Sequence, residues 1–325
     1  ASWAATTPRE RSELLRKAFE LLIERTDDFA ALMTLEMGKP FAEAKGEVAY
    51  GAEYFRWFAE EAVRINGTYL PAPAGGSRLL TMKQPVGPCL MITPWNFPLA
   101  MGTRKIGPAL AAGCTMVIKP AAETPLTMLA LVALLEEVGV PKGVVNVVTT
   151  SDSGGVMEPL IRDPRARKLT FTGSTAVGRK LVEQSAEQLL RVSMELGGNA
   201  PFMVFEDADV DAAVEGAMAA KMRNIGEACT AANRLYVHES VAAEFGEKFA
   251  AKMKAMTVGN GMDEGVTVGP LITGKAVKNV QRLIDGAVAA GATKVCGDEQ
   301  VPSEGNFVAP TVLTNVPGDD DIVRE

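Results

Sequence analysis

From Val86 onward, short apolar segments alternate with longer segments whose apolar residues recur at helical spacing. Strands are expected at 86–92, 115–118, 144–148, 168–172 and 201–205, and helices at 98–112, 125–138, 153–161 and 175–189. Strands that alternate with helices pair in parallel through crossover connections. The pattern therefore predicts a doubly wound α/β domain, a fold in which ligands bind beyond the carboxyl ends of the strands.

A glycine pair at Gly197-Gly198 divides the chain, and further helices are expected at about 209–224, 240–256 and 274–290. A length of 325 residues allows two domains, and we predict a first domain from 1–67 and 86–196 and a second α/β domain from 197–325. Residues 68–85 are expected to form a polar hairpin that carries little apolar surface for a domain core, and we expect this hairpin to pair with another subunit.

Composition excludes several classes of protein. The formal net charge is −7 with both signs interspersed, which provides neither a basic stripe for nucleic acid nor a polybasic membrane patch. The apolar run that starts at Val86 is broken by prolines and cannot span a bilayer, and we expect no signal peptide before it. Four cysteines without metal-ligand spacing are typical of a reducing compartment. We therefore expect a cytoplasmic protein with no nucleic-acid, membrane or metal partner.

One cysteine is a candidate nucleophile. Cys229 follows a polar, glycine-containing segment, where basic groups and backbone N–H dipoles can lower a thiol pKa. The other three cysteines lie in or beside apolar strands and are expected to be inert core thiols. An acylated cysteine needs a base that activates water, but the single histidine, His238, fits a surface position at a strand end. Glu195, beside the glycine pair, is the remaining candidate for that base.

Three further motifs stand at expected strand ends. Asn96 lies in a proline-stiffened loop, where its amide is either an oxyanion donor or a simple turn residue. Lys119 ends a strand, where ligands bind in open sheets, although lysines are common there. Gly173-Ser174 joins a strand to a helix whose free N–H groups can take a phosphate. No G-x-G-x-x-G follows a predicted strand, so any dinucleotide site is a variant one.

Taken together, these motifs resemble those of the aldehyde dehydrogenase superfamily in order and spacing, over essentially the whole chain. The matching segments are Pro94-Trp95-Asn96-Phe97-Pro98, Lys119-Pro120, Phe171-Thr172-Gly173-Ser174, Glu195-Leu196-Gly197-Gly198 and Gly226 through Cys229 to Asn233-Arg234. The resemblance implies that 1–67 with 86–196 is the cofactor-binding domain and that 197–325 is the catalytic domain. It also implies a homodimer or homotetramer, assembled with the help of the 68–85 hairpin.

The resemblance also implies roles for individual residues. Cys229 attacks the aldehyde carbon, the Asn96 side chain and the Cys229 backbone N–H hold the oxyanion, and Glu195 activates the water that hydrolyses the thioester. Lys119 contacts the adenosine ribose, and Gly173 and Ser174 lie beside the pyrophosphate. The full set of expected cofactor-binding residues is Thr93, Pro94, Trp95, Lys119, Ala122, Gly173, Ser174 and Leu196.

Substrate and cofactor are inferred from a few positions. Arg104 and Arg223 resemble the arginines that bind the distal carboxylate in succinate-semialdehyde members of the family, and the alternative is that each pairs with a structural carboxylate. We expect an acidic semialdehyde, with succinate semialdehyde ahead of glutarate semialdehyde. Ala122 replaces a glutamate frequent in NAD-preferring relatives, which favours NADP, while the neighbouring Glu123 leaves NAD as the alternative.

The chain also departs from the family pattern. Ala231 replaces the second cysteine that permits a redox-switch disulfide in many succinate-semialdehyde enzymes. The family's Glu-Ile-Phe-Gly-Pro motif and C-terminal strand do not follow, so we expect a fragment of a longer enzyme, inactive or poorly folded alone. Two other classes are a non-catalytic binding or assembly protein of the same fold and a cysteine hydrolase. Activity with a nicotinamide cofactor distinguishes the dehydrogenase from both.

Overall fold

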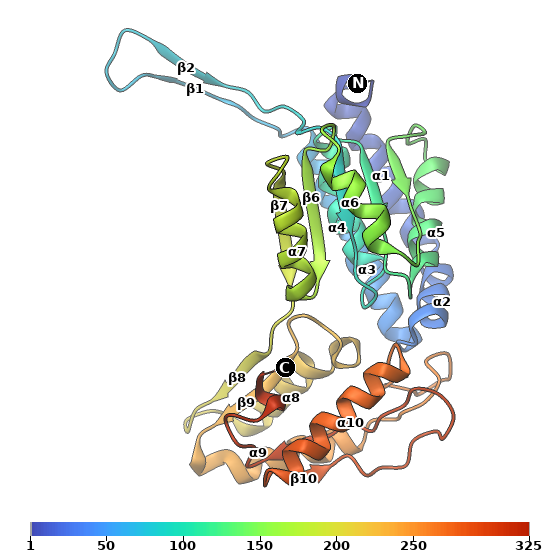
Figure 1. The fold of residues 1–325 in the computed structure, drawn as a ribbon, viewed down its shortest axis with the longest axis vertical. Helices are drawn as coiled ribbons and strands as arrows, with labels where there is room; N and C mark the ends of the chain where they lie inside the picture. Colours follow the sequence, from blue (N-terminus) through green and yellow to red (C-terminus); the bar gives the residue numbers. More distant parts are fainter. Residues whose placement is uncertain (1, 325) are drawn as a thin grey trace. The chain divides into compact units, whose positions relative to one another are not determined.

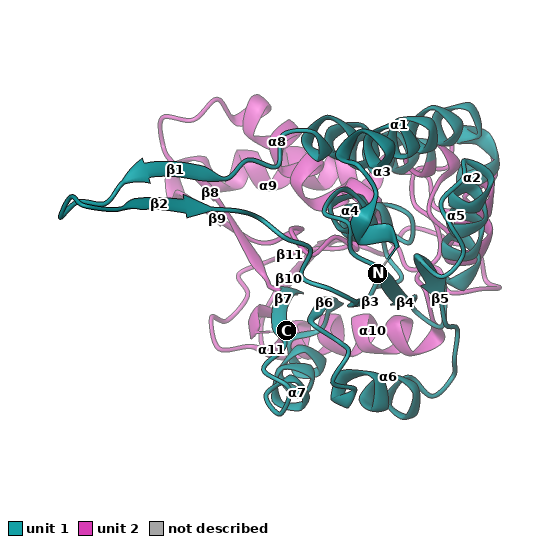
Figure 2. Ribbon diagram, turned by 90° about the horizontal axis from the view of Figure 1, so that it is seen from above, with its two compact units in different colours: residues 1–30, 45–196 teal, residues 31–44, 197–325 magenta. Residues whose placement is uncertain are grey.

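The computed structural model describes residues 2–324 and forms two compact units (Figures 1 and 2). The first comprises residues 1–30 and 45–196, and the second comprises 31–44 and 197–325. The predicted boundary after Leu196 therefore coincides with a boundary between units. Residues 31–44, which the sequence analysis placed in the first domain, group instead with the second unit. The reason is local packing: the Phe41 N–H donates to Gly261 O at 2.9 Å.

The N-terminal part of the chain is helical. A short 3₁₀ turn, η1 (Trp3–Ala5), precedes α1 (Pro8–Glu24), α2 (Thr26–Met37) and α3 (Phe41–Ala62). A capping box begins α1, since Thr7 accepts from the Glu10 N–H and the Glu10 carboxylate accepts from the Thr7 N–H. Arg11 of α1 is buried, and its Nε donates to Ala111 O at 2.9 Å.

The first unit is built on a five-stranded parallel sheet with the order β5-β4-β3-β6-β7. Its strands are β3 (Cys89–Ile92), β4 (Met116–Lys119), β5 (Val145–Val147), β6 (Lys168–Gly173) and β7 (Arg191–Leu196). The connecting helices are α4 (Ala100–Ala111), α5 (Pro125–Glu137), α6 (Ser153–Arg162) and α7 (Thr175–Ser185). Helices α4 and α5 cover one face and α6 and α7 the other (Figure 2). The predicted doubly wound fold is confirmed.

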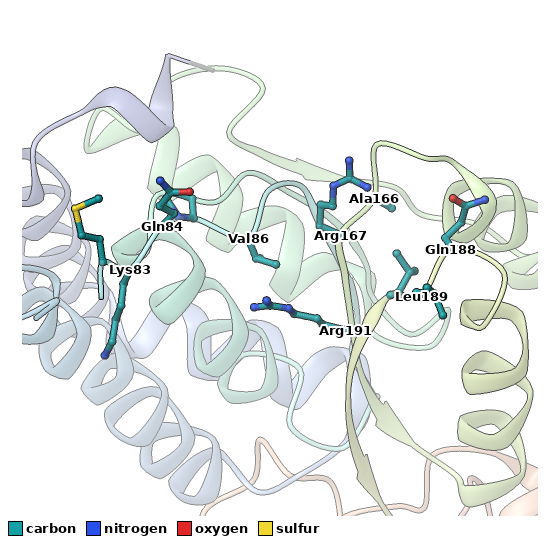
Figure 3. A pocket seen from close by; sticks show the side chains of 11 residues that line it. Lys83, Gln84, Val86, Ala166, Arg167, Gln188, Leu189 and Arg191 are labelled. Atoms are coloured by element: carbon teal, nitrogen blue, oxygen red, sulfur yellow. The ribbon is translucent and has the colours of Figure 1, made fainter. Parts of the chain in front are cut away.

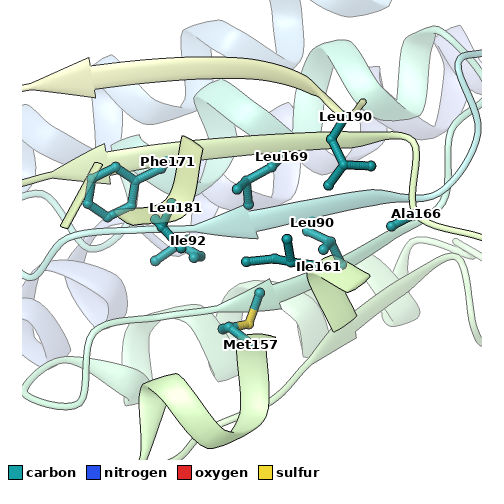
Figure 4. Packing of buried hydrophobic residues seen from close by; sticks show 9 residues of the cluster. All are labelled: Leu90, Ile92, Met157, Ile161, Ala166, Leu169, Phe171, Leu181 and Leu190. Carbon is teal, nitrogen blue, oxygen red and sulfur yellow. The ribbon is translucent and has the colours of Figure 1, made fainter. Parts of the chain in front are cut away.

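A compact apolar cluster fixes β3 and β6 against the helices α6 and α7 (Figure 4). Leu90, Leu169 and Phe171 contribute from the strands, while Ile161 and Leu181 contribute from the helices. Burial of such side chains stabilises a domain by about 1.5–3 kcal/mol each. The same packing sets where β3 and β6 end, and these ends carry the Asn96 loop and the Gly173-Ser174 turn.

The hairpin consists of β1 (Thr68–Pro71) and β2 (Arg78–Thr81), paired antiparallel with Thr68 opposite Thr81. It projects from the first unit (Figure 1), and all eight strand residues are exposed. Tyr69, Leu80 and Met82 are among the exposed apolar side chains. A two-stranded hairpin is marginally stable alone, so its exposed edges are suited to further pairing.

The second unit contains two small sheets. Parallel strands β8 (Ala200–Val204) and β9 (Ala232–Val237) form one, and antiparallel β10 (Thr293–Cys296) and β11 (Val312–Thr314) form the other. Its other elements are α8 (Val210–Met222), η2 (Arg223–Gly226), α9 (Glu239–Lys254), α10 (Gly274–Ala289) and α11 (Asp321–Arg324). Phe245, Phe249 and Met253 of α9 pack into its core. No helix within residues 2–324 is long and apolar enough to cross a membrane.

Candidate active site

Four of the predicted motifs meet at the carboxyl edge of the first unit's sheet. Ile92 lies opposite both Lys119 and Phe171, and Gly173 lies opposite Leu196. The strand order reverses between β3 and β6, because the chain proceeds outward from β3 to β5 and then returns to β6. A ligand in an open α/β sheet binds at such a reversal, so this edge is the first part of the candidate site.

The Asn96 loop is fixed at both ends. The Thr93 N–H donates to Lys119 O at 3.2 Å, and Pro94, Trp95 and Asn96 are half-buried. At the start of α4, the buried Glu47 accepts the N–H groups of Leu99 and Ala100 at 2.9 and 3.0 Å. A carboxylate on these free donors also suits the positive end of the helix dipole. Glu47 is a positioning residue that the sequence analysis missed.

Lys119 is buried, and its Nζ donates to Ser153 Oγ at 3.1 Å. Burial lowers the pKa of this lysine, and the nearby Glu123 carboxylate acts in the opposite direction. Ala122, three residues further along, is exposed. Lys119 is therefore fixed by its hydrogen bond to Ser153, whereas the exposed Ala122 position is accessible to a ligand.

Side chains at Gly173 and Gly178 would require neighbouring side chains to move. A Cβ on Gly173 would lie 2.4 Å from Phe171 Cζ, and a Cβ on Gly178 would lie 2.6 Å from Leu196 Cδ2. Ser174 is the N-cap of α7, and its Oγ accepts from the Val177 N–H at 3.4 Å. The predicted strand-to-helix turn is present, and a phosphate at this helix start stays a prediction.

A lysine that the sequence analysis passed over lies beside this edge. Lys105 of α4 is buried, and its Nζ donates to Thr170 Oγ1 at 3.0 Å and to Thr172 Oγ1 at 2.9 Å. Burial lowers its pKa to about 8, while the Glu195 carboxylate acts in the opposite direction. Lys105 could have been noticed in the sequence, because it lies on the apolar face of α4 with Met101 and Ile106, which are also buried. Arg104, next to it, is half-buried with its guanidinium 6.0 Å from the Tyr54 ring centroid.

Glu195 and Leu196 end β7, the edge strand of the same sheet, and both are exposed. Thr172 is the register partner of Glu195. An exposed carboxylate at a strand end can accept a proton from water, which is the chemistry proposed for it from the sequence.

In the second unit, Cys229 is exposed in the loop between η2 and β9. Three consecutive residues before it, Asn224, Ile225 and Gly226, have φ values of 55°, 52° and 84°. The left-handed region is unfavourable for a β-branched isoleucine, so tertiary contacts must hold this backbone. One such contact is the Asn224 N–H donating to Glu43 Oε2 at 3.4 Å. Arg223, at the start of this loop, is exposed.

Glu227, two residues before the cysteine, is a further residue that the sequence analysis did not single out. Burial raises its pKa to about 8, while Lys39, the Ile272 N–H and Lys221 act in the opposite direction. Lys39 is completely buried, and Lys221 Nζ donates to Asn233 Oδ1 at 2.6 Å. Lysine side chains from 31–44 and α8 thus lie close enough to influence the carboxyl group of the cysteine loop.

The remaining observations concern His238 and a surface hollow. His238 is exposed after β9, and its Nδ1 lies 2.9 Å from Ser240 Oγ, in accord with a structural role. A hollow lined by Lys83, Arg167 and Arg191 lies at the amino ends of the first unit's strands (Figure 3). This is the opposite edge from Lys119 and Ser174, so the hollow is not part of the candidate site.

Comparison with known proteins identifies the class. Residues 1–325 match the model of the aldehyde dehydrogenase family. The chain is 60% identical over 316 residues to a succinate-semialdehyde dehydrogenase of Paenarthrobacter nicotinovorans, covering 97% of this chain and 70% of that protein. It is 53% identical over 324 residues to an NADP(+) succinate-semialdehyde dehydrogenase of Escherichia coli strain K12, covering 100% of this chain and 67% of that one. A glutarate-semialdehyde dehydrogenase of Pseudomonas putida is 54% identical over 324 residues.

Solved structures agree. The crystal structure of an NADP-dependent enzyme of E. coli superposes with a TM-score of 0.96 at 53% identity, covering 99% of this chain and 66% of that one. The chain belongs to the aldehyde dehydrogenase family, and the family predicted from its motifs is confirmed. It spans about two thirds of the length of these relatives.

Proposed function

We propose that the protein containing this chain oxidises succinate semialdehyde to succinate with NADP. The observation that carries this proposal is the set of motif residues at one sheet edge, in a chain that also presents an exposed Cys229 and belongs to the aldehyde dehydrogenase family. Relatives named for succinate semialdehyde and for glutarate semialdehyde support an acidic substrate, with glutarate semialdehyde as the alternative.

The sheet edge of the first unit fits a dinucleotide. Buried Thr93 Oγ1 has no hydrogen-bond partner among the described residues, so this hydroxyl is available to a ligand at the strand end. Lys119 and the Gly173-Ser174 turn supply a cation and a close backbone approach for ribose and pyrophosphate. Ala122 leaves space beside the ribose, and relatives named as NADP(+) enzymes support this cofactor, with NAD as the alternative.

In the proposed mechanism, the Cys229 thiolate attacks the aldehyde carbon and forms a thiohemiacetal. The Asn96 amide and the Cys229 backbone N–H donate hydrogen bonds to the oxyanion. A nicotinamide cofactor held at the sheet edge by Thr93, Lys119 and the Gly173-Ser174 turn would supply the acceptor for the hydride of this carbon. Glu195 then takes a proton from water, which hydrolyses the thioester and releases the acid. Arg104 and Arg223 bind the distal carboxylate of the substrate.

The proposal extends to assembly and location. The exposed apolar residues of the β1–β2 hairpin support pairing with a second copy in a homodimer or homotetramer. All four cysteines are free, which suits the cytoplasm.

The test is the formation of reduced nicotinamide from succinate semialdehyde by the protein at its full natural length, with NADP and NAD compared. We expect faster turnover with NADP, loss of turnover in Cys229→Ala, and retention in Cys296→Ala, where the removed thiol is a buried one. Turnover that persists in Cys229→Ala would refute the nucleophile. A folded protein that oxidises no aldehyde with either cofactor would favour the binding-protein alternative.

A further inference from the structure

Two tyrosines of α3 form a pair that the sequence analysis did not single out. Tyr50 and Tyr54 are one helical turn apart, and their hydroxyl groups form a hydrogen bond of 2.7 Å. Their ring centroids are 5.3 Å apart with an interplanar angle of 67°, the edge-to-face arrangement that aromatic pairs favour. Tyr50 is 38% exposed and Tyr54 is half-buried, so the two rings fix each other and still border solvent.

Tyr54 also contacts α4. The guanidinium carbon of Arg104 lies over the Tyr54 ring, 6.0 Å from its centroid. The face of an aromatic ring carries negative charge density, and it attracts a cation without using the N–H groups of a guanidinium. These N–H groups lie in the guanidinium plane, where they can form two parallel hydrogen bonds to a carboxylate. The ring contact therefore restrains the Arg104 side chain without consuming its hydrogen-bond donors.

Close packing of α3 against α4 sets the place of this contact. Glu47, on the same face of α3 two turns before Tyr54, accepts the N–H groups at the start of α4 at 2.9 and 3.0 Å. A Cβ on Gly51 would lie 3.4 Å from Ala100 Cα, and a Cβ on Gly107 would lie 3.2 Å from Tyr54 O. The two helices thus approach each other closely at glycines, and the Tyr54 ring has a fixed place before any substrate binds.

Arg104 lies beside the sheet edge that carries the candidate site. The next residue is Lys105, whose Nζ donates to Thr172 Oγ1 at 2.9 Å, and Thr172 is the register partner of Glu195. Arg104 is also four residues into the helix that begins after the Asn96 loop. A restrained arginine at this place suits the anionic end of an aldehyde bound at that edge.

We propose that Tyr54, supported by Tyr50, is a positioning residue that restrains Arg104 for the distal carboxylate of the substrate and thereby sets a preference for acidic over uncharged aldehydes. This inference rests on the role proposed for Arg104 in the oxidation of succinate semialdehyde. An arginine that is already restrained loses less side-chain entropy when it binds the carboxylate. Because this carboxylate contact is the same in the ground state and the transition state, the ring affects KM and not kcat.

Steady-state kinetics of the protein at its full natural length tests this role. We expect Tyr54→Leu to raise KM for succinate semialdehyde about three- to tenfold, as the loss of a partly exposed cation–π contact predicts, with kcat unchanged. KM for butanal, an uncharged aldehyde with the same number of carbons, should stay within about twofold. Tyr54→Phe keeps the ring and should keep KM for succinate semialdehyde close to that of the parent. Equal increases for both aldehydes would show a merely structural role and overturn the proposal, as would an unchanged KM in Tyr54→Leu.

Three further variants complete the kinetic test. Trp57→Leu removes an exposed ring from the same helix and should leave both KM values unchanged. Tyr50→Phe removes only the hydrogen bond between the hydroxyl groups, and it should raise KM for succinate semialdehyde less than Tyr54→Leu does. Tyr54→Met replaces Tyr54→Leu if the leucine variant does not fold, because an unbranched side chain fills irregular space. An effect of Trp57→Leu as large as that of Tyr54→Leu would overturn the proposal.

Chemical modification without turnover distinguishes a failure of this inference from a failure of the proposed function. Phenylglyoxal modifies arginine side chains, and peptide mass spectrometry gives its rate at Arg104 with and without succinate, the proposed product. In the parent and in Tyr54→Phe, succinate at twice its Kd should slow modification of Arg104 about threefold, and the same concentration should protect Tyr54→Leu less. The exposed Arg179 is the internal control, whose rate should not change.

The outcomes of this experiment are separable. Equal protection of Arg104 in all three proteins would overturn the inference about Tyr54 and leave the carboxylate role of Arg104 in place. Modification of Arg104 at the same rate with and without succinate in the parent protein would overturn both.

Discussion

Lys105 Nζ lies 2.9 Å from Thr172 Oγ1, so a cation on α4 is fixed against the strand position whose register partner is Glu195. The lysine is desolvated, and its Nζ donates to two uncharged hydroxyl oxygens, Thr170 Oγ1 and Thr172 Oγ1. Burial therefore lowers its pKa to about 8, and the attraction of Glu195 offsets only part of this change. A lysine that titrates near neutral pH beside the proposed base links the stability of this sheet edge to pH.

The first prediction concerns that stability. The folded pKa of Lys105, about 8, lies below its unfolded value, so the unfolded chain binds more protons between the two values. Stability due to this group is therefore lost as pH falls through about 8 and regained as pH rises. Methionine at position 105 cannot bind a proton. The free energy of unfolding of the parent protein, relative to that of Lys105→Met, should therefore increase by at most about 2 kcal/mol between pH ~7.5 and ~9.5. Urea unfolding of both proteins at the two pH values measures the difference.

The matched control is Lys180→Met, which removes an exposed lysine. Its stability difference from the parent should stay constant within about 0.5 kcal/mol over the same range. A Lys105→Met difference that is equally constant would show that Lys105 keeps an ordinary pKa in the folded protein.

Strand-helix alternation was sufficient to predict the first unit's fold, because buried parallel strands give continuous apolar runs. β7 was not predicted, since Arg191-Val192-Ser193-Met194-Glu195-Leu196 alternates polar and apolar residues as an exposed edge strand does. β10 and β11 are only four and three residues long and contain a register shift. Such elements depend on pairing between distant segments, which a local pattern does not reveal.

In the candidate site too, local motifs could be recognised in the sequence, but residues positioned by distant contacts could not. Cys229, Glu195 and Lys119 were proposed from the sequence because each lies in a short motif with recognisable chemistry, and their roles stay predictions. Lys105 and Glu47 were missed because their partners are far away in sequence: Thr172 lies 67 residues from Lys105, and Leu99 lies 52 from Glu47. Their roles come from tertiary contacts. The assignment of 31–44 to the second unit likewise depends on contacts with residues more than two hundred positions away.

Glu227→Gln should stabilise the second unit in a pH-dependent manner. The folded pKa of Glu227 is raised to about 8, so the folded state holds a proton that the unfolded state lacks between pH ~4.5 and ~8. That stability is present at low pH and is lost as pH rises through the folded value. Glutamine cannot lose a proton, so the variant should gain about 2–4 kcal/mol over the parent between pH ~5 and ~8. Unfolding followed at both pH values checks this, and an unchanged difference would contradict it.

Arg223→Ala should weaken recognition of the substrate's distal carboxylate. We expect KM for succinate semialdehyde to rise roughly 10- to 100-fold, since a charge-assisted hydrogen bond contributes about 1.5–3 kcal/mol. KM for an uncharged aldehyde of the same length should change less than about threefold. Arg223→Lys keeps the charge but cannot form two parallel hydrogen bonds to a carboxylate. Its KM for succinate semialdehyde should lie between those of the parent and Arg223→Ala. Equal effects on both aldehydes would show that Arg223 does not bind the carboxylate.

Ala122→Glu should reverse the preference between cofactors. Ala122 is exposed three residues beyond Lys119, and a carboxylate there would repel a 2′-phosphate while accepting a hydrogen bond from a free ribose hydroxyl. We expect kcat/KM with NADP to fall by at least about tenfold, with NAD unchanged or improved, because about 1.4 kcal/mol of repulsion is sufficient for that factor. Ala122→Gln is the matched control, since it adds the same bulk without charge and should weaken NADP far less. If both variants lower NADP and NAD activity alike, steric bulk rather than charge governs this position, and the basis for an NADP preference at Ala122 fails.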